Sequence, residues 1–320
     1  MKKRIFTYMS ILTVGLLMSA CQSPQPKLTS MKCEFVPDGG EAIVYGSNLT
    51  DGEIVFPGDL VVKANKGSND SVLIVTVPEG ATTGKLKVRT KAGESSSDFF
   101  FRDDRNMIID FDKRMATWGG FDPFDENGDK IKGIVDDFSK DSITLLPAEL
   151  PDGCSGSYGF LYGRYVNDWV MTHTMYLQYV ANPEEGGRGE KSVADNFQHY
   201  DLKDLVFKFE VYIPKNVAYS GPRTEIFFGP YNAANKHGRE QSAICFWKPY
   251  AETNSFYADS WTTISIPLTE FYHSIDNDTS TSKYPLDLKK ATNFSFVQFG
   301  PADSSLVFMC VDNFRIVPTK

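Results

Sequence analysis

Strict alternation of apolar and polar residues in short runs is the feature that most constrains the fold of this chain. In DLVFKFEVYIP (204–214) every second residue from Leu205 onwards is apolar, whereas Lys208, Glu210 and Tyr212 lie between them. Side chains on a strand alternate between its two faces, so this run predicts an antiparallel strand with one buried and one wetter face. Similar runs bounded by turn residues recur, and no long stretch repeats apolar residues at the helical period. We therefore predict an all-β protein.

The strand-like runs fall into two groups. Between residues 33 and 102, Gly-rich turns separate EAIVYGSNL, GEIVFPG, DSVLIVTVPEG and TGKLKVRTKAG, which predicts a small sandwich. RDDRN (102–106) is interpreted as the boundary. Residues 104–320 then predict a larger β-sandwich, a jelly roll. About 300 residues suffice for one large domain and one small one.

The N-terminus has the composition of an export signal. A basic MKKR precedes an apolar stretch too short to span a membrane, so residues 1–20 are predicted to be a signal peptide. The following Met18-Ser19-Ala20-Cys21 resembles a bacterial lipobox, which implies cleavage before Cys21 and its lipidation. The alternative is an ordinary cleavage site with an incidental cysteine. Residues 21–32, polar and Pro-rich, are expected to form a tether.

Charge and cysteine usage exclude several classes of function. The formal net charge of −8 argues against binding nucleic acid through bulk charge. The remaining cysteines are far apart and lack metal-ligand spacing, so we expect buried free thiols, although a disulfide stays open as an alternative. These cysteines are Cys33, Cys154, Cys245 and Cys310.

No metal or cofactor site is predicted. The four histidines lack metal-ligand spacing. FDPFDENGD places oxygens at Asp125, Asn127 and Asp129, as a calcium loop does. However, Lys130 and Asp136 occupy the positions where such a loop needs Gly and Glu. A solvated turn is the interpretation here, and a structural calcium ion elsewhere in the larger domain is left open.

Two groups of motifs carry resemblances to known domains. VPEGATTG (77–84) and the closing Phe99-Phe100-Phe101 make residues 33–102 resemble an IPT/TIG immunoglobulin-like domain, expected here as a rigid spacer. DFDKRMATWGG (110–120), WTTISIPLTEF (261–271) and VDNFRIVP (311–318) occur in this order in the larger domain and look like a carbohydrate-binding jelly roll.

Together with the lipobox, these parts resemble the surface glycan-binding proteins of Bacteroidetes polysaccharide-utilisation loci. The resemblance is closest to the second type, whose C-terminal domain is named for xyloglucan binding. The chain departs from the larger relatives in having one TIG-like domain. QSPQPK after Cys21 also lacks the acidic pair that often marks surface export in these bacteria.

The resemblance implies a lipoprotein that is anchored in the outer membrane, faces the cell surface, and binds a polysaccharide without modifying it. Such proteins hold the glycan near a TonB-dependent transporter and surface glycosidases. The resemblance suggests xyloglucan, mixed-linkage glucan or mannan, but the sequence does not fix which sugar is bound.

Binding is expected at an aromatic platform, because a flat ring covers the apolar C–H face of a sugar. In AICFWKPY (243–250), Trp247 lies opposite Ile244 and Phe246 and is expected to leave the sheet away from the core. With Pro249 and Tyr250 it resembles the platform of this family.

Further rings are weaker candidates. Trp169 follows a turn, Trp118 precedes two glycines, and Tyr231 and Tyr257 lie in predicted loops. For Trp247, Trp169 and Trp118, structural packing is the alternative. Four polar side chains are candidates for hydrogen bonds to sugar hydroxyls, and the sequence does not choose among Arg223, Glu225, Asn232 and Lys248.

An enzyme is the main alternative function. GPRTEIFFG resembles part of an alginate-lyase strand, but the Gln-x-His and YFKAG-like strands of that family are missing. A retaining glucanase needs two carboxylates about 5–5.5 Å apart, and no strand carries the ExDxxE pattern. We therefore predict no catalytic residues. A jelly-roll polysaccharide lyase or glycoside hydrolase and a protein-binding adhesion lipoprotein are kept as alternatives.

Overall fold

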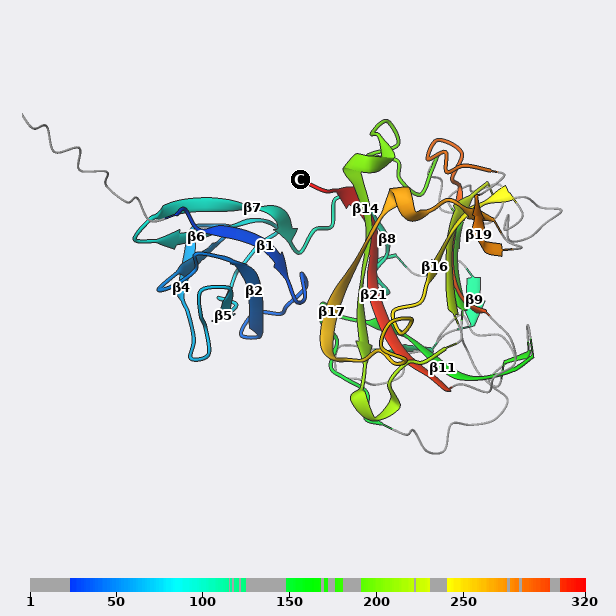
Figure 1. The fold of residues 1–320 in the computed structure, drawn as a ribbon, viewed down its shortest axis with the longest axis horizontal. Helices are drawn as coiled ribbons and strands as arrows, with labels where there is room; N and C mark the ends of the chain where they lie inside the picture. Colours follow the sequence, from blue (N-terminus) through cyan, green and yellow to red (C-terminus); the bar gives the residue numbers. More distant parts are fainter. Residues whose placement is uncertain are drawn as a thin grey trace, which may run out of the picture.

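The chain folds into a smaller and a larger β-domain that lie side by side (Figure 1). The computed structural model describes residues 24–114, 116, 118–120, 122–124, 148–167, 170–171, 176–180, 191–221, 223–230, 241–274, 277–281, 284–299 and 306–320. No helix within these ranges is long and apolar enough to cross a membrane. The predicted signal peptide and Cys21 lie outside the described residues.

The smaller domain is an immunoglobulin-like sandwich of two antiparallel sheets. One sheet has the order β1–β2–β5 and the other β4–β3–β6–β7 among the described residues. Alternate residues such as Val44, Val75, Ile54 and Val88 are buried between them in one core. The strands are β1 (Lys27–Met31), β2 (Glu41–Ser47), β3 (Glu53–Phe56), β4 (Leu60–Lys63), β5 (Val72–Thr76), β6 (Gly84–Thr90) and β7 (Gly93–Phe101).

The predicted tether of residues 21–32 is too long, because β1 belongs to the sandwich. Leu28 and Met31 of β1 are buried in the core of the smaller domain, and the strand pairs with β2. The preceding Gln25 is also fixed, since its Nε2 donates to the carbonyl oxygen of Ala92 at 2.6 Å. Five residues with two apolar positions gave too weak an alternation to be recognised in the sequence.

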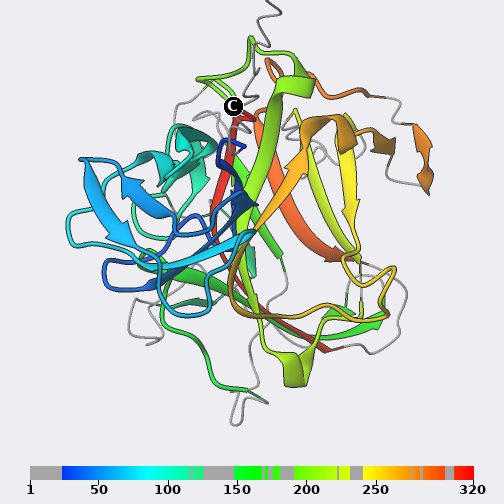
Figure 2. The same ribbon diagram turned by 60° about the vertical axis from the view of Figure 1, so that its left-hand side comes forward.

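The larger domain is a sandwich of two antiparallel sheets, each with seven strands in the described part of the chain. The sheet with β14, β17 and β21 lies next to the smaller domain, and we call it the near sheet (Figures 1 and 2). The sheet with β16 and β19 lies on the side away from the smaller domain, and we call it the far sheet. The near sheet contains β8 (Met107–Ile109), β10 (Asp122–Phe124), β11 (Tyr158–Asn167), β12 (Val170–Met171), β14 (Leu205–Ile213), β17 (Ala258–Pro267) and β21 (Leu306–Pro318). The far sheet contains β9 (Trp118–Gly120), β13 (Tyr176–Val180), β15 (Arg223–Gly229), β16 (Ala243–Trp247), β18 (His273–Ser274), β19 (Asn277–Thr281) and β20 (Asn293–Phe299).

Short 3-10 turns connect some of these strands. They are η2 (Leu202–Asp204), η3 (Lys215–Val217) and η5 (Leu268–Glu270). Two all-β sandwiches in this order confirm the predicted fold class.

Aromatic rings fill the space between the near and far sheets. Phe207 and Phe209 of β14 contact Phe314 of β21 at ring-centroid distances of 6.1 and 5.4 Å. Across the core, Phe294 and Phe296 of the far sheet lie 5.5 and 5.3 Å from Phe314. The predicted apolar face of β14 is confirmed, since its alternate residues from Leu205 to Ile213 are fully buried.

The opposite face of β14 is not wet, and this part of the prediction is wrong. Glu210 is fully buried and Lys208 is 9% exposed. The smaller domain covers this face and supplies Glu34, whose Oε1 lies 2.5 Å from Nζ of Lys208. Buried charges are tolerated when they are paired and hydrogen-bonded, which is why a charged strand face can lie beneath a second domain.

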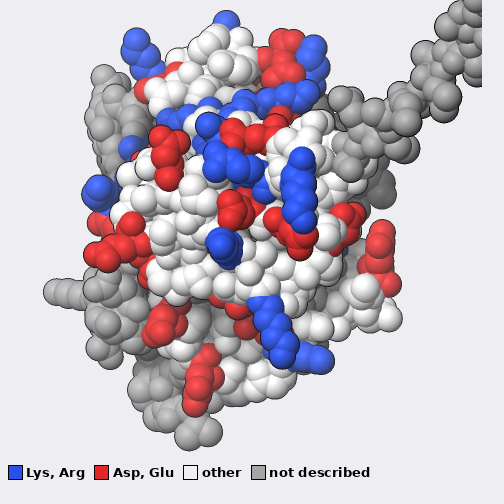
Figure 3. All heavy atoms as spheres, turned by 90° about the vertical axis from the view of Figure 1, so that its left-hand side faces the viewer, with Lys and Arg blue, Asp and Glu red and all other residues white. Residues whose placement is uncertain are grey.

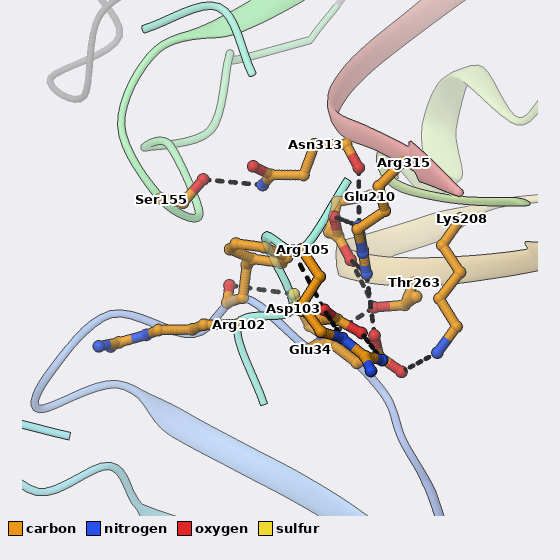
Figure 4. A network of polar contacts seen from close by, with 12 residues as sticks. Glu34, Arg102, Asp103, Arg105, Ser155, Lys208, Glu210, Thr263, Asn313 and Arg315 are labelled. Atoms are coloured by element: carbon orange, nitrogen blue, oxygen red, sulfur yellow. Dashed lines mark hydrogen bonds and ion pairs between the residues drawn. The ribbon is translucent and has the colours of Figure 1, made fainter. Parts of the chain in front are cut away.

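Arg315 of β21 is the centre of this buried network (Figure 4). Its guanidinium donates to both carboxylate oxygens of Glu210, at 2.8 and 3.0 Å, and to Oε2 of Glu34 at 2.9 Å. Burial disfavours the cation, yet the charges of Glu210 and Glu34 together raise the pKa of Arg315 above its ordinary value. Glu34 of the smaller domain and Lys208, Glu210 and Arg315 of the larger one thus share a single charge cluster.

Backbone contacts join the two domains at the same place. The amide of Thr263 on β17 donates to the carbonyl oxygen of Lys32 at 2.7 Å. The amide of Glu34 donates to Oγ1 of Thr263 at 2.7 Å, and Thr263 in turn donates to Glu210. Trp261, half-buried, packs on Tyr158 with ring centroids 5.4 Å apart beside this contact. The domains are therefore held in one relative orientation.

The predicted boundary segment is folded onto itself. Arg105 forms a fork to Asp103, at 2.8 and 2.7 Å, and its guanidinium lies 3.9 Å from the ring centroid of Phe100. Arg102 donates to the carbonyl oxygen of Val36 and to Asp38. This segment connects the domains without acting as a loose linker.

The prediction of buried free thiols is confirmed for Cys33, Cys154, Cys245 and Cys310. Cys154 lies at the domain contact, where its thiol donates to Asp312 at 3.4 Å. Asp312 is fully buried and also accepts from Ser155 at 2.9 Å. Burial, with a smaller contribution from the charge of Glu210, raises the pKa of Asp312 well above its usual range.

Charges on the outer end of the smaller domain are mixed. Figure 3 shows lysines and arginines interspersed with aspartates and glutamates on this face. Pairs such as Arg89 with Glu94, at 2.8 Å, account for part of this pattern. A mixed surface of this kind attracts neither polyanions nor polycations strongly.

Replacing Arg315 with methionine should lower the free energy of unfolding by about 3–5 kcal/mol, because Glu34 and Glu210 would keep buried charges without their partner. Urea denaturation measures the loss. Arg89→Met is the matched control, since its half-exposed pair should contribute less than about 1 kcal/mol. Equal losses in the two variants would show that the network does not hold the domains.

The buried carboxyl groups should make the protein less stable as pH rises. A carboxyl group whose pKa is raised in the folded state stabilises the fold at pH values below its ordinary pKa, near 4. This stabilisation is lost as pH rises through the raised pKa. We expect the free energy of unfolding to fall as pH rises above the ordinary carboxyl pKa. Asp312→Asn should reduce this slope, by at most about 1.4 kcal/mol per pH unit.

Asp38→Asn is the control for this measurement. The hydrogen bond that Asp38 accepts from Arg102 lowers the pKa of Asp38. The contribution of Asp38 to the free energy of unfolding is therefore lost only as pH falls below the ordinary aspartate pKa. The slope above the ordinary carboxyl pKa should therefore stay as in the wild type. An Asp312→Asn protein with an unchanged slope would refute the assignment.

Candidate functional site

The outward side of the far sheet is built from alternate residues of three central strands. On β15, Ile226 and Phe228 enter the core between the sheets, so Glu225 and Phe227 belong to the opposite side. The register pairs Glu225 with Phe246 and Val297, and Phe227 with Ile244 and Ser295. We call this side the far face and define it by Glu225, Phe227, Ile244, Phe246, Ser295 and Val297.

Phe227, Ile244 and Val297 on this side are buried, Phe246 is half-buried, and a charged pair lies beside them. Arg223 donates through Nε and a terminal nitrogen to Oε1 of Glu225, at 3.2 and 3.0 Å. Glu225 is fully buried, and its bond to Arg223 compensates for the lost water. The guanidinium of Arg223 lies 4.4 Å from the ring centroid of Phe246, so a planar cation covers an aromatic ring.

Further polar groups surround Phe246. Nζ of Lys248 lies 6.0 Å from its ring centroid, and the imidazole of His273 lies 5.2 Å from it. Tyr272 stacks next to His273 at 4.1 Å and is 41% exposed. The site combines flat apolar area with amine, guanidinium, imidazole and phenol groups. This composition suits a ligand with both apolar faces and hydroxyl groups.

The backbone register extends this surface to the edge of the sheet. Position 118 pairs with 178 on β13, and 178 pairs with Ser295 of the far face. Ser295 is followed in the same row by Phe227 and then Ile244, which pairs with His273. Position 118 is therefore in backbone register with the row of Ser295, Phe227 and Ile244.

Trp247 was expected to be exposed, and this is wrong. It is 9% exposed and lies in the core, with its ring centroid 5.3 Å from Phe209 and 6.1 Å from Tyr219. The predicted alternation is correct, because Trp247 does face away from Ile244 and Phe246. Both sides of β16 are apolar, however, and it is the side with Trp247 that meets the near sheet.

The other predicted aromatic residues are spread over the domain. Tyr250 is half-buried and packs edge-on against Tyr219 at 5.3 Å. Tyr257 is 45% exposed and lies beside the smaller domain, away from the far face. Trp169 and Tyr231 lie outside the described residues, as do Asn232 and the loop with Asp125.

The structure brings together three of the four polar candidates, namely Arg223, Glu225 and Lys248, around Phe246. Phe246 and His273 were missed as members of the site. A signal was present in RTEIFFG, where two opposite charges two residues apart interrupt an apolar strand. Such a spacing places both charges on one face. Among the described residues, no group of three or more His, Cys, Asp or Glu side chains could hold a metal ion.

An immunoglobulin-like sandwich followed by a larger sandwich with an aromatic and charged outer face defines a class of modular β-sandwich proteins. Residues 101–318 match the family described as the surface glycan-binding protein B xyloglucan binding domain. The chain therefore belongs to this family. The comparison with curated proteins gave no match.

Two solved structures share the fold. The surface glycan-binding protein PbSGBP-B from Prevotella bryantii is 19% identical, with a TM-score of 0.62 over 92% of this chain and 77% of that chain. SGBP-B from a complex xyloglucan utilization locus in Bacteroides uniformis is 18% identical, with a TM-score of 0.57 over 92% of this chain and 73% of that chain.

The position of Trp247 leads to a test of its role. Trp247→Ala should lower the free energy of unfolding by about 3–5 kcal/mol, because it leaves a cavity between the sheets. Tyr257→Ala, at an exposed ring, should cost less than about 1 kcal/mol. Chemical denaturation of both variants measures the difference. A Trp247→Ala protein of wild-type stability would contradict the core assignment.

Proposed function

We propose that the chain binds a polysaccharide on the far face and does not modify it. The observation that carries this proposal is the match of residues 101–318 to a glycan-binding family, together with the cations of Arg223 and Lys248 beside the half-buried ring of Phe246 on the far sheet. The near sheet is covered by the smaller domain through Glu34 and Thr263. The smaller domain does not cover the far sheet (Figure 1). On the far face, Phe227 and Ile244 are buried, so the groups open to a ligand are those around the half-buried Phe246, namely Arg223, Lys248, Tyr272 and His273.

The chemistry of the far face suits a sugar chain. A pyranose ring has an apolar C–H side that packs on an aromatic ring and hydroxyl groups that bond to charged side chains. Position 118, a tryptophan, lies at the sheet edge in register with the row that leads to Phe227 and Ile244, and we propose its ring as a stacking surface. Arg223 and Lys248 supply donors near Phe246. Two or three such contacts would give micromolar to millimolar affinity.

The proposed ligand is a neutral β-linked backbone, with xyloglucan the first candidate because the matched family is described by it. Mixed-linkage glucan and mannan are the other backbones to test. Stacking recognises the shape shared by these rings, and hydrogen bonds from the loops distinguish them.

The location of the protein is part of the same proposal. Lipidation of Cys21 would anchor the chain to the outer membrane, facing the cell surface. Only three residues separate Cys21 from Gln25, which is bonded to the smaller domain. The binding domain would therefore be held close to the membrane, where a TonB-dependent transporter and surface glycosidases could receive the captured chain. Many anchored copies on one glycan would add avidity.

Affinity electrophoresis of residues 22–320 through gels containing xyloglucan, mixed-linkage glucan or galactomannan tests the function. Retardation by at least one glycan is expected. Trp118→Ala should weaken it by about 5- to 150-fold, the loss of one stacked ring worth roughly 1–3 kcal/mol. Tyr200→Ala, which removes an exposed tyrosine outside the site, is the matched control.

The same proteins should release no reducing ends and no ultraviolet-absorbing unsaturated products from these glycans. Formation of either product would show that the protein is a hydrolase or a lyase and would contradict the proposal that it only binds the glycan. Unretarded migration in every gel would overturn the proposed function.

A further inference from the structure

A groove of about 760 Å³ lies between the two domains, on the side of the near sheet. Its walls come from both domains. Ser30, Lys32 and Tyr45 belong to the smaller domain, whereas Tyr257, Asp259 and Thr262 belong to the larger one. We call it the interdomain groove. Its volume lies within the range of small-molecule binding sites, and it is separate from the far face.

Each wall of the groove carries a tyrosine. Tyr45 on β2 is half-buried and pairs with Ser30 of β1, which brings an aromatic ring and a hydroxyl group to the same wall. Tyr257 precedes β17 and is 45% exposed, the largest exposure of a Phe, Tyr or Trp ring in the described part of the chain. Nζ of Lys215 lies 5.4 Å from its ring centroid. Rigid rings with polar tips bind with a low entropy cost.

Two ion pairs lie at the groove, whereas Asp98 on its wall has no ion pair among the described residues and Asp103 pairs with Arg105. Nζ of Lys32 lies 3.9 Å from Asp259, and this ion pair joins the two walls. At the floor, Lys208 is paired with Glu34, below Thr263 (Figure 4). Paired charges give little net attraction for a polyanion or a polycation, whereas they offer donors and acceptors to a neutral ligand rich in hydroxyl groups.

The groove is preformed because the domain contact beneath it is rigid. Lys32 and Glu34, which border the groove, are fixed to Thr263 by two hydrogen bonds of 2.7 Å. Arg315 holds Glu34 from below at 2.9 Å. A ligand that enters does not have to order the two domains first, which lowers the cost of binding.

We propose that the interdomain groove is a second binding site for the same neutral polysaccharide, with Tyr45 and Tyr257 as its stacking rings. The proposal rests on the proposed function of the chain. The far face and the groove lie on opposite sheets of the larger domain. One chain of the protein could therefore bind two segments of a long glycan or two neighbouring glycans, and two sites on one rigid body add avidity.

The test compares four forms of residues 22–320, namely wild type, Trp118→Ala, Tyr257→Ala and the double variant. In gels containing the glycan that retards the wild type, Trp118→Ala should keep a residual retardation that the double variant loses. Tyr257→Ala alone should weaken retardation about tenfold, as expected for one stacked ring. Tyr200→Ala is the matched control, and Tyr45→Ala should reproduce Tyr257→Ala.

Titration calorimetry with a short oligosaccharide of the same glycan gives an independent readout. The wild type should bind two molecules per chain, and Tyr257→Ala one. If the wild type binds one molecule and Tyr257→Ala binds the same number, the groove is not a binding site, and the proposed function is unaffected. A wild type that binds no glycan would overturn both.

Discussion

The buried contact of Arg315 with Glu34 and Glu210 is the interaction on which the rest of the structure depends. Each partner comes from a different segment, and removal from water would be costly for any of them alone. The cluster forms only when the smaller domain lies on the near sheet, because Glu34 belongs to the short segment after β1 that is hydrogen-bonded to Thr263. A hydrophobic patch would allow the domains to slide, whereas matched charges and hydrogen bonds specify one orientation.

This orientation gives the two sheets of the larger domain different roles. The near sheet meets the smaller domain with Lys208, Glu210 and Arg315, all of which are buried. The far sheet has the same aromatic core on its inner side, but its outer side carries Phe246 beneath Arg223. A glycan-binding surface is therefore expected on the far sheet, and the smaller domain acts as a rigid support that also forms one wall of the interdomain groove.

Much of the fold followed from alternation, but the environment of each face did not. The pattern in DLVFKFEVYIP correctly assigned Phe207 and Phe209 to a core. It failed for Glu210, because a charged strand face is wet unless another domain covers it. The covering segment with Glu34, and Arg315 which pairs with both glutamates, lie far away in sequence. Trp247 was misplaced for a related reason. Both sides of its strand are apolar, so the alternation gives two faces without showing which one meets the second sheet.

The most direct test of the central claim is a crystal structure of residues 22–320 with a xyloglucan oligosaccharide, or with an oligosaccharide of whichever glycan retards the protein. The account predicts sugar rings on the far face, in contact with Trp118 and within hydrogen-bond distance of Arg223 or Lys248. A complex in which the oligosaccharide contacts the smaller domain alone, with the far face unchanged and empty at saturating ligand, would contradict it.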